Sequence, residues 1–203
     1  ENAFQNCSSL KSVDLPKSLT LIDQNAFQGC TSIESITVPK SLTDIDHSVF
    51  SNCESLKSVE FEHGSTQVGS SMFFGCDNLN TVILPDTITT INHSAFQACT
   101  ALESIDLPDG VTTIGDYAFY NCTSLTDVYI TDIAAWVNIS FSNAYSNPLC
   151  SNDLDKKLYL NGELITDLII PESVTSIGDS AFRNCSGLSS ITIPGSVTSI
   201  GDY

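Results

Sequence analysis

The stretch LKSVDLPKSLTLIDQNAF (residues 10–27) ends in Ala-Phe, is followed by Cys30, and begins again 23 residues later at Ile33. Its closing signature, an apolar residue and Phe followed three residues later by Cys, recurs in the same register at Phe4, Phe27, Phe50, Phe73, Phe96, Phe119 and, after a gap, Phe182. A fixed period of 20 to 50 residues is typical of small units that bury an apolar face only by stacking. The sequence therefore predicts one elongated repeat structure.

Each repeat contains a short apolar alternation that predicts a strand with one buried face. The triples are Leu10/Val13/Leu15, Ile33/Ile36/Val38, Leu56/Val59/Phe61, Leu79/Val82/Leu84, Leu102/Ile105/Leu107, Leu125/Val128/Ile130, Ile165/Leu168/Ile170 and Leu188/Ile191/Ile193. Because a full length of chain separates successive strands, they must run parallel. A proline follows six of them and ends the strand, since proline has no amide to donate to a ladder.

A second apolar pair in each repeat, such as Leu19/Ile22, predicts a further strand-like run on the opposite side of the coil. The residue after that pair is always Asp, Gly or Asn: Asp23, Asp46, Gly69, Asn92, Gly115, Gly178 and Gly201. These residue types tolerate positive φ, so we expect this column to reverse the chain in a left-handed conformation. A single 3₁₀ or helical turn is expected between the Ala-Phe pair and the cysteine.

Seven of the eight cysteines occupy one column of the repeat, and Cys150 alone lies off it. Equivalent side chains on stacked strands point the same way, about 4.8 Å apart. A disulfide needs Cβ atoms that converge to about 3.8 Å. The pattern therefore predicts a ladder of buried thiols. With no C-x-x-C and no His/Cys cluster, we expect neither a metal site nor a cofactor.

The string L-x-x-I-x-L-P-x-x-[LVI]-x-x-I-G-x-x-A-F-x-x-C resembles the BspA-type leucine-rich repeat, a family with 23-residue repeats on surface proteins of host-associated bacteria and some protists. The resemblance implies a right-handed leucine-rich-repeat solenoid of the α/β class, mostly β with short 3₁₀ turns, with a parallel sheet on one face. It also suggests a secreted or cell-surface adhesion protein. The chain departs from common leucine-rich repeats in lacking an Asn ladder.

We expect residues 1–203 to form a single solenoid, and because both ends fall inside a repeat we expect a fragment of a longer chain. The register is lost in an insertion at about 131–164. There Asp132 predicts the cap of a short helix, and Asn161-Gly162 predicts a β-hairpin turn. The only tryptophan, Trp136, and Phe141 also lie there. They could form a binding surface or complete the core where the Phe column is missing, and we favour the core.

The acidic composition limits the partners. The net charge is −17, from 24 acidic and seven basic side chains, which repels nucleic acid and anionic membranes. No segment contains the roughly 18 apolar residues that a membrane span requires, so no direct membrane insertion is expected. The charge also favours a soluble monomer.

Alternation leaves two outward columns on the strand face. One is uniformly small and polar. The other mixes acidic, apolar and aromatic side chains, a composition that suits a contact surface, although scattered exposed apolar residues are common on proteins. Its candidate ligand-binding residues are Ile83, Tyr129, Ile169, Asp14, Glu60 and Asp106.

No catalytic motif is present, His47 and His93 lie in one column two coils apart, and no carboxylate pair is distinguished from the general acidity. We therefore expect no enzyme. The hypothesis is an extracellular or cell-surface module that binds a host-matrix or cell-surface protein. The alternatives are glycan or cell-wall recognition, and a passive spacer that displays another domain.

Overall fold

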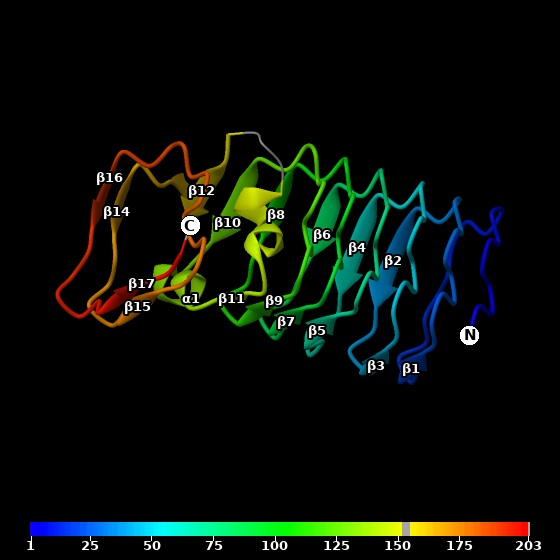
Figure 1. Ribbon diagram of the computed structural model, residues 1–203. Coiled ribbons are helices and arrows are strands. Elements are labelled where there is room, and N and C mark those ends of the chain that lie inside the picture. The colour runs from blue at the N-terminus through cyan, green and yellow to red at the C-terminus, as the bar shows by residue number, and fades with distance from the viewer. Residues whose placement is uncertain (152–154, 203) are drawn as a thin grey trace.

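The computed structural model describes residues 1–151 and 155–202, and in this part of the chain it is a mostly-β stack of coils (Figure 1). The N-terminus lies at one end of the stack, and the last coils lie at the other. One face carries strands β2 (Ser35–Val38), β4 (Ser58–Phe61), β6 (Thr81–Ile83), β8 (Ser104–Asp106), β10 (Asp127–Ile130), β12 (Lys157–Leu160), β14 (Asp167–Ile169) and β16 (Ser190–Thr192).

Strands on this face pair in parallel and in strict register, so that Ser35 lies opposite Ser58 and Ser58 opposite Thr81. They form three sheets, ordered β2-β4-β6, β8-β10-β12 and β14-β16, and the hairpin strand β13 (Glu163–Leu164) adds to the second sheet beside β12 in the antiparallel direction. The predicted strands are confirmed from the second repeat onward. The first alternation, Leu10 to Leu15, is not a strand, because the pairing begins with β2, whose one partner in the sheet is β4.

The second apolar pair of the repeats forms the predicted strand-like run on another face, as two-residue strands, and one strand of the insertion joins them there. They are β1 (Leu21–Ile22), β3 (Asp44–Ile45), β5 (Gln67–Val68), β7 (Thr90–Ile91), β9 (Thr113–Ile114), β11 (Ser140–Phe141), β15 (Ser176–Ile177) and β17 (Ser199–Ile200). All their pairings are parallel. Each regular coil therefore has three sides: the face of the longer strands, the second face with the two-residue strands, and a side of turns that contains the Ala-Phe pair.

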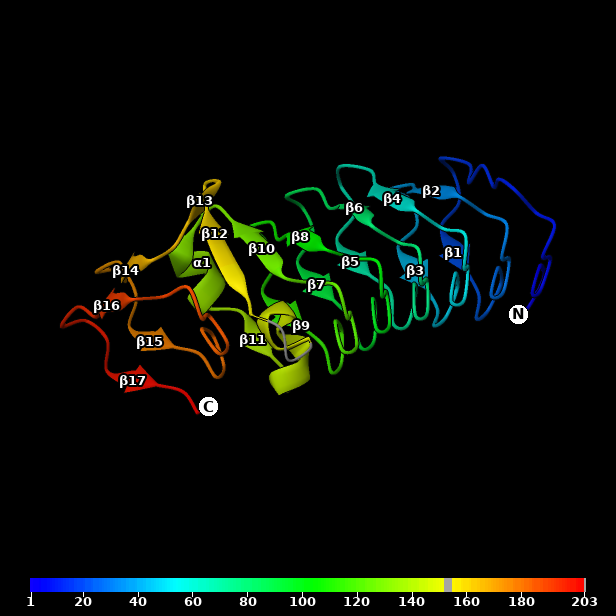
Figure 2. The same ribbon diagram turned by 90° about the horizontal axis from the view of Figure 1, so that it is seen from above.

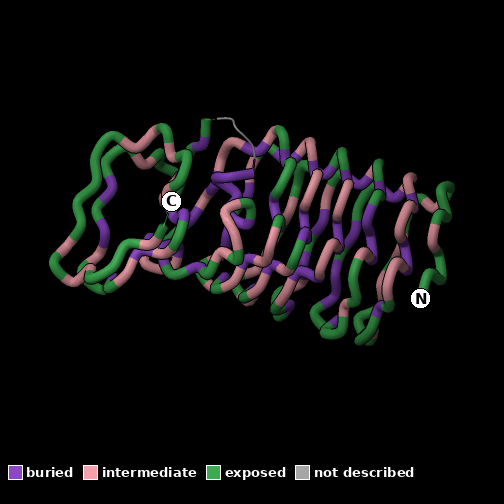
Figure 3. Tube along the Cα trace, in the orientation of Figure 1, coloured by how far each residue is buried: buried purple, intermediate pink, exposed green. Residues whose placement is uncertain are grey.

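Columns of identical side chains fill the core. Phe50, Phe73, Phe96 and Phe119 are fully buried and stack face to face, with centroids of neighbouring rings 5.5 to 6.0 Å apart. Figure 3 shows buried segments in every central coil, whereas β16 and β17 at the C-terminal end are exposed throughout. Since each ring is covered by its neighbours, apolar burial is shared between coils and not contained within one.

The predicted thiol ladder is confirmed for the central coils. Cys30, Cys53, Cys76, Cys99 and Cys122 are buried and not disulfide-bonded. Each Sγ donates a hydrogen bond to the carbonyl oxygen of the Phe in the preceding coil, over 3.1 to 3.4 Å. At the two ends the column is less covered: Cys7 is exposed and Cys185 half-buried.

The predicted left-handed column is wrong. Positive φ occurs two residues later, at Asn2, Asn25, Ser48, Ser71, Ser94, Tyr117 and Ser180, and again four residues further along, at Asn6, Gly29, Asn52, Gly75, Ala98, Asn121 and Asn184. The Gly/Asn/Asp column instead meets the preceding coil closely. A Cβ on Gly115 would lie 2.6 Å from the backbone nitrogen of His93. Close approach of the backbones, not φ, accounts for the glycine there.

The turns hold 3₁₀-type hydrogen bonds as expected, for example from Cys30 N to Phe27 O at 3.2 Å. They do not extend into a helix, because a left-handed residue lies on each side of the Phe. In the regular coils the turns also pair with the next coil, as from Phe27 N to Val49 O at 2.9 Å. The turn side is therefore a ladder in its own right.

The insertion contains the helix α1 (Ile133–Val137), two 3₁₀ helices, η1 (Ala144–Ser146) and η2 (Pro148–Cys150), and the hairpin strand β13 (Glu163–Leu164). Asp132 caps α1 as predicted, accepting a hydrogen bond from Ala134 N at 2.7 Å. The Asn161-Gly162 turn is also confirmed: both residues have positive φ, and β12 and β13 pair antiparallel.

Trp136 completes the core, as favoured from the sequence. Its side chain is 1% exposed, it meets Phe141 edge to face, and its Nε1 donates to Ala181 O at 2.9 Å. Asn147 is fully buried, donates to Ser180 O and accepts from Leu149 N. The insertion is thus joined by specific hydrogen bonds to the turn of the following coil.

Candidate binding surface

The register of β8, β10 and β12 builds the best-formed group of candidate residues. Asp106 lies opposite Tyr129, and Tyr129 lies opposite Tyr159 of the hairpin. The two tyrosine rings stack with centroids 4.6 Å apart and planes 21° from parallel. Asp127 of β10 lies opposite Lys157 of β12 in the neighbouring outward column. We call Asp106, Asp127, Tyr129, Lys157 and Tyr159 the strand-face patch.

The electrostatics of the patch keep both phenols protonated. Burial, then the Asp127 carboxylate, and then Tyr159 and Asp106, raise the pKa of Tyr129. Burial and Asp127 raise the pKa of Tyr159. One carboxylate oxygen of Asp127 is shielded from solvent and has no hydrogen-bond partner among the described residues. The patch therefore presents a stacked pair of protonated phenols beside a carboxylate, of which one oxygen is shielded from solvent.

A pocket of about 450 Å³ adjoins the patch at the ends of the strands. Tyr129 and Asp106 line it, with Asp86 and Asp109, and the hairpin turn Asn161-Gly162 forms part of its wall. Figure 2 shows the β12–β13 hairpin standing out at this edge of the strand face. The insertion thus contributes to the surface as well as to the core.

The other predicted residues are dispersed along the stack. Glu60 lies opposite Ile83 on β4 and β6, and Ile83 is 51% exposed. Ile169 is 72% exposed but lies on β14, in a separate sheet, opposite Thr192. The hairpin strand β12 occupies the position next to β10, so Tyr159, and not Ile169, neighbours Tyr129. The sequence signal for this was available: Lys-Leu-Tyr-Leu at 157–160 repeats the pattern of Asp-Val-Tyr-Ile at 127–130.

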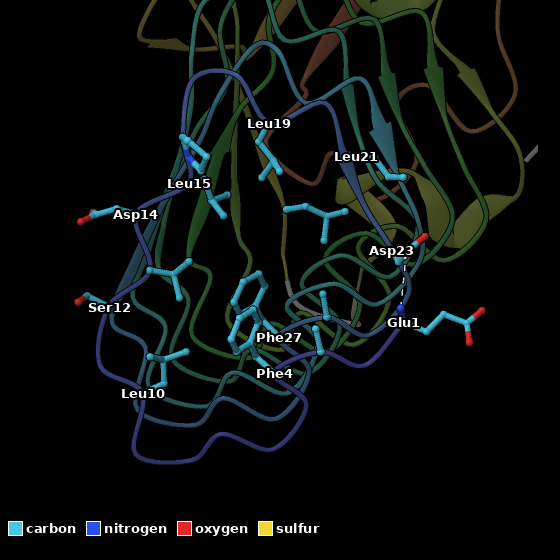
Figure 4. Close-up of a pocket in the computed structure, with 15 residues that line it drawn as sticks. Glu1, Phe4, Leu10, Ser12, Asp14, Leu15, Leu19, Leu21, Asp23 and Phe27 are labelled. Carbon is cyan, nitrogen blue, oxygen red and sulfur yellow. Dashed lines mark hydrogen bonds and ion pairs between the residues drawn. The ribbon is translucent and has the colours of Figure 1, made fainter.

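Asp14 lies apart from this surface, beside the hollow shown in Figure 4. The hollow, about 510 Å³, is the N-terminal end face of the stack, lined by core-type side chains such as Phe4, Leu10 and Phe27. The carboxylate of Asp14 points away from it. Its lining consists of the side chains that stack between coils elsewhere, so the hollow reflects core packing and not a ligand site.

Two further observations bear on chemistry. Among residues 1–151 and 155–202, no group of three or more His, Cys, Asp or Glu side chains is arranged to hold a metal ion. Within the same residues, no helix combines the length and apolarity needed to cross a membrane.

The sequence matches the family described as "BspA type Leucine rich repeat region", in six copies, over residues 1–103, 69–151 and 152–203. The chain belongs to this family. A search of curated protein sequences found no match.

One solved structure agrees with this assignment, and another is similar in sequence. A leucine rich cell surface protein from Faecalibacterium prausnitzii A2-165 is 32% identical, with a TM-score of 0.56, and the match covers 98% of this chain and 53% of that protein. A leucine rich repeat protein from T. pallidum is 25% identical, with a TM-score of 0.49, over 82% of this chain and 72% of that one. The chain spans about half the length of the first of these relatives.

Proposed function

We propose that this chain is a non-catalytic binding module of a bacterial cell-surface protein and that its strand-face patch binds a host-matrix or cell-surface protein. The observation that carries the proposal is the stacked pair Tyr129–Tyr159, flanked by carboxylates at the rim of a pocket. Tyrosine supplies large, rigid contact area with a hydroxyl for hydrogen bonding, and interface hot spots are rich in it.

Support for a surface location comes from the relative described as a cell surface protein. Support for binding without catalysis comes from the family, whose match covers the chain with repeats. A solenoid presents long surfaces along which side chains recur in columns, an arrangement that suits extended protein contacts. In this chain the column is most aromatic where the hairpin joins the sheet.

The test is adhesion of the purified chain to immobilised extracellular-matrix proteins and to host-cell monolayers. Replacing Tyr129 and Tyr159 together with Ser should reduce the bound amount about tenfold, the effect expected when hot-spot aromatic side chains are lost. The matched control is Leu21→Ser, which removes a 47% exposed apolar side chain from the second face and should leave adhesion unchanged. Both variants should keep the circular dichroism spectrum of the parent.

Two results would favour the alternatives. Undiminished adhesion by the double tyrosine variant would remove this patch from the binding surface, and a chain that adheres to nothing would be a spacer. Binding on a glycan array that disappears in the same variant would assign the patch to glycan recognition.

A further inference from the structure

A second aromatic group lies on the turn side of the solenoid, away from the strand-face patch. Tyr117 and Tyr145 stack with ring centroids 5.9 Å apart, and Tyr120 meets both of them edge to face, at 5.7 and 5.0 Å. The ring of His93, from the preceding coil, meets Tyr117 edge to face at 6.2 Å. Tyr117, Tyr120 and Tyr145 are 40%, 40% and 47% exposed, so this group, the turn-side cluster, does not belong to the core.

Tyr117 departs from the residue types that fill its repeat column in the other described coils. There the column holds Asn or Ser, small residues with positive φ: Asn2, Asn25, Ser48, Ser71, Ser94 and Ser180. The sequence places one further tyrosine in this column, Tyr203, which lies outside the described residues. Tyr117 adopts the same left-handed conformation, with φ of 58°. A bulky side chain is unusual in this conformation, and such strained residues concentrate at functional sites. The exposed ring gains no core packing in return.

Tyr120 and Tyr145 depart from the repeat independently of Tyr117. The column of Tyr120 holds mostly polar residues in the other coils: Gln5, Gln28, Ser51, Phe74, Gln97 and Arg183. Tyr145 comes from η1 in the insertion, which Figure 2 places among the turns along one edge of the stack. Reciprocal capping hydrogen bonds between Asn143 and Ser146 stabilise η1. The residue that follows η1, the buried Asn147, donates a hydrogen bond to Ser180 O.

Two tyrosines of one coil thus meet a third from the insertion, which lies 25 residues after Tyr120 in the sequence, and the three exposed rings lie together on a hydrogen-bonded support. We propose that the turn-side cluster is a docking site for an arginine-bearing segment of a basic partner protein. The faces of aromatic rings attract guanidinium groups, and Tyr and Arg are the residues most enriched at the centres of protein interfaces.

The negative charge of the chain favours an arginine-bearing occupant. The chain carries a net charge of −17, and Asp116 precedes Tyr117 directly in the turn. A cationic segment approaching the cluster is therefore attracted by the whole molecule, whereas a second copy of this chain is repelled. The strand-face patch lies on another side of the coil, so separate variants test the two sites independently.

The test uses a fluorescein-labelled peptide of alternating glycine and arginine, and a matched peptide with neutral citrulline in place of arginine, titrated into the whole chain and followed by fluorescence anisotropy. In the variant Tyr117→Ser, Tyr120→Gln, Tyr145→Ser, the first two changes restore residue types of the other coils, and the third removes the ring from the insertion. We expect it to bind the arginine peptide about tenfold more weakly than the parent. The citrulline peptide should bind the parent no better than the variant.

Controls separate the cluster from general attraction and from misfolding. Tyr117→Ser alone should not lower the melting temperature, because Ser occupies this position in four other coils. Leu21→Ser and the double variant Tyr129→Ser, Tyr159→Ser should bind the arginine peptide as the parent does. Equal binding by the triple variant would show diffuse electrostatic attraction and overturn the proposal. A glycan ligand lost in the triple variant, or concentration-dependent dimers, would overturn the choice of occupant.

Discussion

The regular coils between Gln24 and Cys122 and the interrupted region between Thr131 and Cys185 bury their cores by different means. In the regular coils the core consists of columns of the same apolar side chain, and buried thiols donate to carbonyls of the preceding coil. In the interrupted region the buried set includes Trp136, Asn147 and Lys156, each with its own hydrogen bonds to a different segment.

The difference shows where such a chain can carry function. In a regular column each side chain is fixed by the same residue above and below it, so few positions are free to vary. An insertion must satisfy its buried polar groups individually, but it can then present side chains that no repeat column provides. Both aromatic surfaces of this chain, the strand-face patch and the turn-side cluster, use one tyrosine from the insertion.

The largest effect should come from raising the pH, because it acts on every thiol of the regular coils. Burial raises the pKa of Cys53 and of Cys122 from 9.0 to about 12 in the folded chain. The unfolded chain therefore loses these protons at lower pH, so the stability they contribute is complete below pH 9 and is lost as the pH rises to 12. Each thiol accounts for roughly 4 kcal/mol at full loss. Urea denaturation at a series of pH values should show a steep fall above pH 9.

Lys156 has the opposite effect on the pH dependence of stability. Burial lowers its pKa from 10.5 to about 8, so the unfolded chain binds the proton more strongly, and this contribution to stability rises as the pH increases from 8 to 10.5. Because several thiols oppose one lysine, the net slope above pH 9 should be negative. Cys99→Ala should make that slope shallower, and an unchanged slope would show that the buried thiols are not responsible.

Replacing Trp136 with Ala should cost about 3 to 5 kcal/mol, the usual range for a large aromatic side chain lost from a core. Since contacts in a solenoid run between neighbouring coils, the loss should uncouple the C-terminal coils from the regular ones. Hydrogen exchange measured by mass spectrometry should show faster exchange after residue 131 and little change before Cys99. Uniform loss of protection along the whole chain would contradict the distinction between the two regions.

Asn147→Ala should cost about 2 kcal/mol, because it leaves the Ser180 carbonyl and the Leu149 amide without their partner in a buried site. The matched control is Asn78→Ala. Asn78 also donates to a carbonyl of the preceding coil, that of Glu54, but from an exposed position, so the change should be within about 0.5 kcal/mol. Chemical denaturation of both variants gives the comparison directly, and equal losses would contradict it.

The smallest effect is expected on the surface of the regular coils. Lys57 pairs with Glu34 of the preceding coil at 3.0 Å, with both side chains more than half exposed. Lys57→Ala should change the free energy of unfolding by less than about 0.5 kcal/mol. A loss above 1 kcal/mol would show that ion pairs, and not the apolar columns, hold adjacent coils together.

The repeat made most of the fold predictable, because a column read from several copies averages out local ambiguity. The strands, the Phe and Cys columns and the second face follow from it. Within the insertion, Asp132 and Asn161-Gly162 were predictable because a helix cap and a tight hairpin turn depend on residues close in sequence. The left-handed column was misplaced because Gly is also required where backbones approach closely, as Gly115 does.

The candidate surfaces were predictable only where they follow the repeat. Tyr129 and Asp106 were found from strand alternation, whereas Tyr159 joins them through a hairpin strand that lies outside the 23-residue register. The turn-side cluster could not be found in this way, since Tyr145 reaches Tyr117 through the path of a non-repeating segment. Likewise, the burial of Lys156 depends on tertiary packing against Leu125 and Ser151.

We infer that binding resides where the chain departs from its repeat. The most direct test measures adhesion for variants that each replace exposed side chains at one site along the solenoid. The series compares the double variant Tyr129→Ser, Tyr159→Ser, at the hairpin, with Leu21→Ser and Ile83→Ser, which replace exposed apolar side chains on the outer faces of regular coils. We predict that adhesion to matrix proteins or cells is lost only in the tyrosine variant, with all melting temperatures unchanged. Loss of adhesion in Leu21→Ser or Ile83→Ser, with the tyrosine variant still adherent, would contradict the account.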